Sequence, residues 1–164
     1  MNNKIDAHKT DEMILHIQRA DWALNEVIHV LKQQALPLAH KLSQEHLDKH
    51  QKLSKSLSAI IATCINQHLR LVKLISMLEK RTKKEKILKT LDKTNCKGIK
   101  LMTELTAAQY KLGDYIRITK QYQSLELEKI RKRCEFCGDM LSKPVADFGA
   151  NTQHLKSLLS IEEK

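Results

Sequence analysis

Glycine and proline are scarce in this chain, which has four glycines and two prolines among its 164 residues. The two residue types together usually make up about 12% of a protein. Sandwiches, barrels and glycine-rich nucleotide-binding folds need many more turn residues, so the composition argues against those classes. Hydrophobic residues still reach 41% of the chain, which is enough to bury a core in one domain.

Long hydrophobic runs and a disulfide framework are also missing. The longest uninterrupted apolar stretch covers residues 59–62, whereas a membrane-spanning helix needs about 20 apolar residues. The amino terminus lacks the apolar segment of a signal peptide. Four irregularly spaced cysteines are typical of reduced thiols rather than of a secreted disulfide scaffold. We therefore expect a cytoplasmic protein without a transmembrane segment, with signal-peptide-independent secretion as the alternative.

Helical periodicity dominates what is present. Apolar residues recur at steps of three and four over about 10–34, 54–79 and 99–122, and each stripe predicts the buried face of a helix. Pro37 is expected to end or kink the first helix, because proline disfavours the helical conformation of the residue before it. Expected core residues of the three stripes include Leu24, Leu57 and Leu112.

Several residues are expected to interrupt the helices. Gly98 should end a short helix that begins near Ile87, and Gly113 or Ser124 should break the third long helix. The residues expected to end the helical region are Gly138, Pro144 and Gly149.

The sequence thus predicts an all-α protein, an elongated and mostly antiparallel helical bundle with three long helices and shorter helical pieces. We expect a bundle domain over 1–142 and a C-terminal tail over 143–164 that carries a short helix. The apolar stripes are close to coiled-coil spacing, which favours a homodimer formed through helix faces.

A Cys-x-x-Cys-Gly string, starting at Cys134 and Cys137, could supply two thiolates to zinc. Cys64 and His68, four residues apart on a helix, would complete a four-ligand site. The alternative, which we favour, is packing, because both thiols of the string continue an apolar stripe and cysteines are commonly buried. His68 also lies on its stripe, where a hydrogen-bonded interior histidine is expected. No cofactor is therefore expected, and zinc is the alternative.

Basic residues exceed acidic ones by 29 to 19, giving a net charge of +10. Such charge binds phosphate backbones through counterion release, or acidic membrane surfaces, or simply forms a solvated face. Six aromatic residues are few for stacking bases, so any nucleic acid would be held without sequence readout. The two clusters that carry this hypothesis are Lys80, Arg81, Lys83, Lys84 and Lys86, and Lys129, Arg131, Lys132 and Arg133.

No catalytic or phosphate-binding motif emerges from the sequence, so we expect a protein that is not an enzyme. The leading hypothesis is a helical protein-interaction module of the adaptor, chaperone or secreted-effector type. It would bind a protein partner or a second copy through its helix faces. The first alternative is a basic protein that binds the phosphate backbone of nucleic acids. The second is a zinc- or thiol-dependent protein that uses Cys134 and Cys137.

Overall fold

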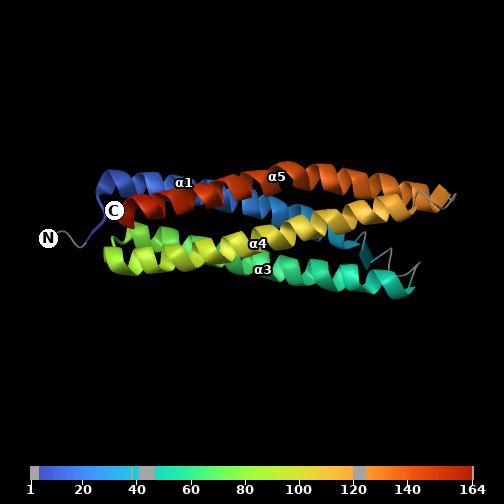
Figure 1. Ribbon diagram of the computed structural model, residues 1–164, viewed down its shortest axis with the longest axis horizontal. Helices are drawn as coiled ribbons and strands as arrows, with labels where there is room; N and C mark the ends of the chain where they lie inside the picture. Colours follow the sequence, from blue (N-terminus) through green and yellow to red (C-terminus); the bar gives the residue numbers. More distant parts are fainter. Residues whose placement is uncertain (1–3, 38, 41–46, 120–124, 164) are drawn as a thin grey trace.

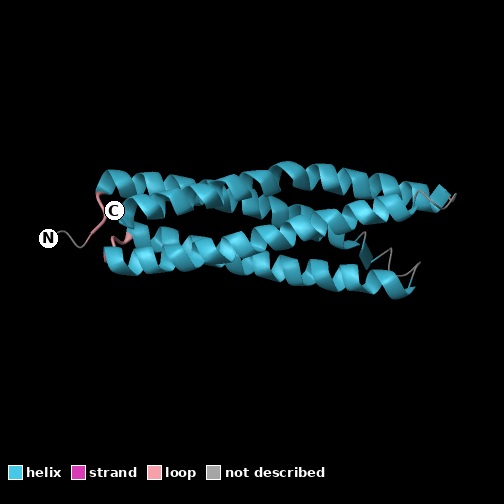
Figure 2. Ribbon diagram, viewed as in Figure 1, coloured by secondary structure: helices cyan, strands magenta, loops and turns pink. Residues whose placement is uncertain are grey.

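The computed structural model describes residues 4–37, 39–40, 47–119 and 125–163. Helices occupy almost all of these residues, and the described part of the chain contains no strand (Figure 2). The α-helices are α1 (Ala7–Val30), α3 (Leu47–Glu79), α4 (Lys84–Thr119) and α5 (Leu125–Glu163), and a π-helical turn, η1 (Leu31–Ala35), extends α1.

The helices form an elongated bundle in which successive helices run antiparallel (Figure 1). The start of α1, the α3–α4 turn and the end of α5 lie together at one end, on the left of the figure. Helix α1 contacts α3 and α5, and α4 also contacts α3 and α5, so that α1 and α4 are diagonally opposed. At 1.5 Å per residue the 39 residues of α5 span about 58 Å. The predicted fold class is confirmed.

One continuous core runs along the bundle and is built from the predicted apolar stripes. Leu24 and Leu57 are fully buried, as expected, whereas the side chain of Leu112 lies outside the described residues. Phe148, contributed by α5, is among the largest fully buried side chains. Long helices of this kind are stabilised chiefly by burying such stripes rather than by intrinsic propensity.

The hydrogen-bonding pattern of the first helix changes just before Pro37, but the helix does not end there. A π-helical turn precedes the proline, and Leu36 and Pro37 continue in helical conformation. Proline has no N–H and its ring crowds the carbonyl four residues earlier, and a π-turn is one way for a helix to relieve this conflict. The residue therefore alters the helix rather than terminating it.

Gly98 does not end a short helix, contrary to the sequence prediction. Helix α4 continues through it from Lys84 to Thr119, merging the predicted short helix with the third long one, so the bundle has four long helices. The glycine is needed for close approach instead. A Cβ atom there would lie 3.0 Å from Cγ2 of Thr152 on α5 and 3.2 Å from Nε2 of Gln67 on α3.

The third long helix ends before residue 125, but not at Gly113 as one of the two predicted break points required. Helix α4 passes Gly113 without interruption, and the chain reverses between Thr119 and Leu125. Ser124, the other predicted break point, lies outside the described residues. A reversal here is expected, because an unbroken helix would extend far beyond a compact domain of this size.

Residues 143–163, expected to form a tail with a short helix, belong to α5. Neither Pro144 nor Gly149 ends the helix. Val145 and Phe148 are buried in the common core, so this segment is part of the bundle rather than a tail. An interior proline costs a helix about 3 kcal/mol, and burial of the surrounding apolar side chains offsets that cost here.

We predict that Gly98→Ala destabilises the protein by about 1–3 kcal/mol, because the added methyl group overpacks the contact with Thr152. Helix propensity alone would make the alanine variant more stable than the wild type, because alanine favours helix and glycine does not. Chemical denaturation measures the difference, and adding Thr152→Ser should recover part of the loss. Gly149→Ala is the matched control, since its Cβ would meet only the flexible end of Met102. Equal effects at both glycines would contradict the close-approach explanation.

Candidate functional site

Of the four residues proposed for a zinc site, the structure describes the side chains of Cys64 and His68. In the part of the chain that the structure describes, no three His, Cys, Asp or Glu side chains gather as a metal site would require. Cys64 on α3 is fully buried. Burial raises the pKa of its thiol to about 12, and the nearby carboxylate of Glu104 acts in the same direction.

Cys134 and Cys137 lie in the first half of α5, within continuous helix, so their backbone does not form the tight turn of a zinc knuckle. Their side chains are outside the described residues. Helix α5 lies diagonally across the bundle from α3, which carries Cys64 and His68. A metal function of the cysteine pair stays a prediction.

His68 joins α3 to α1 through a polar contact, as expected of a hydrogen-bonded histidine. Its Nδ1 atom lies 2.6 Å from Oδ1 of Asp21. Asn25 donates from Nδ2 to the backbone oxygen of Asp21 at 2.9 Å and approaches Oδ2 at 3.3 Å. The imidazole therefore has a structural partner, and this contact fixes the register of α1 against α3.

The two basic clusters predicted from the sequence lie at opposite ends of the bundle. Lys80, Arg81 and Lys83 are exposed at the α3–α4 turn, whereas the second cluster is close to the start of α5 (Figure 1). Lys84 and Lys86 begin α4 beside the first cluster. In the second cluster Lys129, Lys132 and Arg133 are exposed, and the side chain of Arg131 lies outside the described residues. The structure therefore does not join the clusters into one surface.

A longer basic surface on α4 was missed by the sequence analysis. Lys89 is followed by Lys93, Lys97 and Lys100, and all four side chains are exposed. Their steps of four, four and three residues place them on one side of the helix. The spacing was visible in the sequence, but the predicted helix end at Gly98 separated Lys100 from the three lysines before it.

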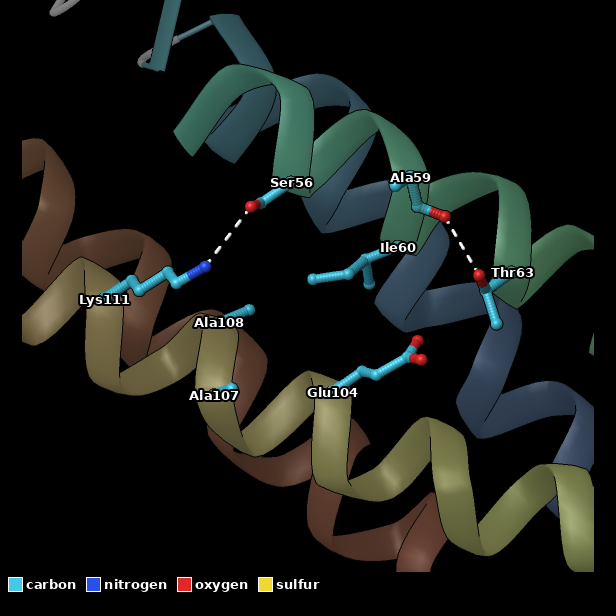
Figure 3. Close-up of a pocket in the computed structure, with 8 residues that line it drawn as sticks. All are labelled: Ser56, Ala59, Ile60, Thr63, Glu104, Ala107, Ala108 and Lys111. Atoms are coloured by element: carbon cyan, nitrogen blue, oxygen red, sulfur yellow. Dashed lines mark hydrogen bonds between the residues drawn. The ribbon is translucent and has the colours of Figure 1, made fainter. Parts of the chain in front are cut away.

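A cavity of about 280 Å³ lies between α3 and α4, and Figure 3 shows its lining. Most of the lining side chains are small or apolar. At its polar ends, Lys111 donates from Nζ to Oγ of Ser56 at 3.2 Å, and Glu104 extends toward α3. The hydrogen bond between Lys111 and Ser56 links α4 to α3 across the cavity.

An exposed tryptophan on α1 was also missed. Trp22, the one tryptophan of the chain, is 72% exposed on the face opposite the core stripe. Leu15, exactly seven residues earlier and therefore on the same face, is 45% exposed. A shallow hollow of about 420 Å³ beside the indole is lined by Trp22, Asn25, Glu26, His29, Val30 and, from α5, Met140.

Two histidines meet between α1 and α5. The ring centroids of His16 and His154 are 3.9 Å apart, with the ring planes tilted by 49°. Partial burial lowers the pKa of His16, and the positive charges of His154 and Arg19 add to this effect, while Glu12 opposes it. The neutral form of His16 is therefore favoured in the folded state.

No family model, curated protein or solved structure matches this chain. None of the helices in the described ranges is both long and apolar enough to cross a membrane.

We predict that the protein loses stability as the pH falls below about 6.5, the ordinary pKa of histidine. The pKa of His16 is lowered on folding, so the unfolded chain takes up a proton at higher pH than the folded one. The loss should level off below the folded-state pKa. Urea denaturation across this range measures it, and His16→Gln should flatten the curve. His8→Gln, an exposed site near the start of the same helix, is the control, and an equal flattening there would contradict the assignment to His16.

We also predict that Cys64 resists alkylation in the native protein near pH 8, whereas Cys96, which is exposed on α4, reacts readily. Iodoacetamide labelling followed by peptide mass spectrometry separates the two sites. In denaturant both cysteines should react alike. Labelling of native Cys64 as fast as Cys96 would show that the thiol is neither buried nor protonated.

Proposed function

We propose that the protein is a non-catalytic helical interaction module that associates with a second copy of itself through the outer face of α1. The observation that carries the proposal is the exposed indole of Trp22 on that face. Large aromatic side chains, tryptophan above all, supply much of the binding energy at protein interfaces.

Two exposed apolar side chains lie on the outer face of α1. They are Leu15, which is 45% exposed, and Trp22, which is 72% exposed. Their spacing of seven residues places them on one side of the helix, so α1 presents an apolar strip to solvent.

The charges that flank Trp22 fit a second copy of the same helix. Arg19 and Glu26 are seven residues apart and lie on the same side of the exposed face. Two helical turns separate them, and no ion pair engages either residue in the described structure. They are therefore available to residues of another molecule.

A two-fold axis near Trp22 makes this arrangement self-complementary. If the α1 helices of two copies pack antiparallel around their tryptophans, Arg19 of each copy approaches Glu26 of the other. Two equivalent ion pairs then border an apolar centre, which is the usual form of an isologous interface. Leu15 and His29, seven residues to either side of Trp22, extend the same face along the helix.

We predict that the protein is dimeric in size-exclusion chromatography with light scattering, and that Trp22→Ala weakens association at least about tenfold. Truncation of a central aromatic anchor commonly costs about 2 kcal/mol or more. Tyr110→Ala is the matched control, because Tyr110 is 74% exposed but lies on the diagonally opposite helix α4. A monomer at all concentrations, or equal loss with Tyr110→Ala, would contradict the proposed dimer.

Charge exchange tests the symmetry of the interface. Arg19→Glu and Glu26→Arg should each weaken self-association, because each places like charges opposite one another. A mixture of the two variants should form a heterodimer, and the double exchange should restore the homodimer. Circular dichroism confirms that each variant is folded. Failure of the mixed variants to associate would show that α1 does not pair antiparallel around Trp22.

A further inference from the structure

We propose that one face of α4 binds the phosphodiester backbone of a nucleic acid duplex, independently of the dimer surface on α1. The face consists of a regular row of five lysines, called the α4 lysine row below. Its members are Lys86, Lys89, Lys93, Lys97 and Lys100.

The α4 lysine row is a straight line of free positive charges. Its steps of three, four, four and three residues keep it on one side of the helix over about 21 Å. All five side chains are exposed, and no hydrogen bond or ion pair in the described structure engages their ammonium groups. Evenly spaced ammonium groups match the evenly spaced phosphates of a nucleic acid backbone, and each contact releases condensed counterions.

The row lies on the side of α4 that faces α3, where Lys111 and Arg70 add positive charge and Glu104 adds one negative charge. The same helical side continues through Glu104 to Lys111, both of which line the cavity against α3 (Figure 3). On α3, Lys73 is exposed, and Arg70 donates to Oε1 of Gln67 at 3.3 Å. Gln67 donates in turn to the backbone oxygen of Thr94 on α4 at 3.0 Å. These bonds hold the two basic helices in fixed register.

Acidic residues border the row without interrupting it between Lys86 and Lys100. Glu85 and Asp92 lie beside Lys89 on α4, and Glu104 follows Lys100 on the side of the helix that carries the row. Across the bundle, α3 and α4 carry 13 basic and 6 acidic residues, whereas α1 and α5 carry 8 basic and 11 acidic ones. The positive field is therefore concentrated on one half of the molecule, which favours a polyanion over a compact neutral ligand.

The turn between α3 and α4 adds an arginine in an unfavourable backbone conformation. Arg81 has a φ of 52°, in the left-handed region that favours glycine. The turn is closed by bonds from the backbone N–H of Thr82 to the oxygen of Met77 at 3.0 Å and of Arg81 to the oxygen of Leu78 at 3.1 Å. A cation therefore stands beside the α4 lysine row at a position where glycine would stabilise the fold.

A nucleic acid fits this surface better than a membrane does. Helices that lie on membranes combine basic residues with large apolar side chains that insert among the lipids. The exposed hydrophobic residues of α4, Ile99 and Tyr110, lie on the flank of Asp92 rather than beside the lysines. With no aromatic side chain in the row, base stacking is absent, and binding should depend little on sequence.

The test is fluorescence anisotropy with labelled duplex DNA and RNA of about 24 base pairs and mixed sequence, at about 50–200 mM salt. The variant Lys93→Gln, Lys97→Gln and Lys100→Gln should bind at least about tenfold more weakly. Its slope of log affinity against log salt should fall by about 0.9 for each lysine removed. A comparison of the DNA and RNA arms shows which duplex supplies the phosphates.

The matched control removes the same charge elsewhere. Lys129→Gln, Lys132→Gln and Arg133→Gln neutralise exposed cations at the other end of the bundle and should change affinity less than about threefold. Equal losses in both triple variants would overturn the proposal in favour of non-specific attraction by net charge. Binding to phosphatidylserine vesicles without binding to either duplex would also overturn it.

Arg81→Gly separates a binding role from a structural one. Relief of the left-handed strain should make the variant harder to unfold in urea, while its affinity for duplex falls along with the lost cation. If the variant loses stability as well as affinity for duplex, Arg81 has a structural role and the binding role is contradicted. Trp22→Ala should retain duplex binding per chain, so failure of the dimer proposal and failure of this one remain distinguishable.

Discussion

The close approach of three helices around Gly98 is the constraint on which the rest of the structure depends. Gln67 on α3, Gly98 on α4 and Thr152 on α5 meet where a side chain on α4 would not fit. The bond from buried Gln67 to the Thr94 oxygen fixes α3 against α4 at this level. Polar contacts inside an apolar core specify one register among many that hydrophobic burial alone would allow. That register sets the position of every outward-facing residue.

Once the register is set, the two diagonally opposed helices present different chemistry to solvent. Helix α1 exposes Leu15 and Trp22, and α4 exposes the α4 lysine row. The cavity between α3 and α4 is lined mainly by small and apolar side chains, and the hydrogen bond from Lys111 to Ser56 crosses it. The proposed functions follow from these outer faces, which a regular bundle leaves free because its core needs only the inner stripes.

The sequence was sufficient to predict an elongated all-α bundle, because the apolar spacing that buries Leu24 and Leu57 is itself the fold signal. It was insufficient wherever packing overrides local preference. Gly98 and Pro144 were taken as helix ends, yet the burial of long stripes on both sides carries each helix through them. Trp22 was overlooked because its importance comes from being outside the stripe, and exposure is decided by which helices surround it.

The fluorescence of Trp22 tests the central claim most directly, namely that opposite faces of the bundle bind different partners. As the single tryptophan of the chain, it reports on the α1 face alone. Emission should shift to shorter wavelength as protein concentration rises and the indole becomes buried in the dimer, and saturating duplex should leave that shift unchanged. An emission spectrum that stays at the exposed wavelength at every concentration, or that responds to duplex rather than to concentration, would contradict the account.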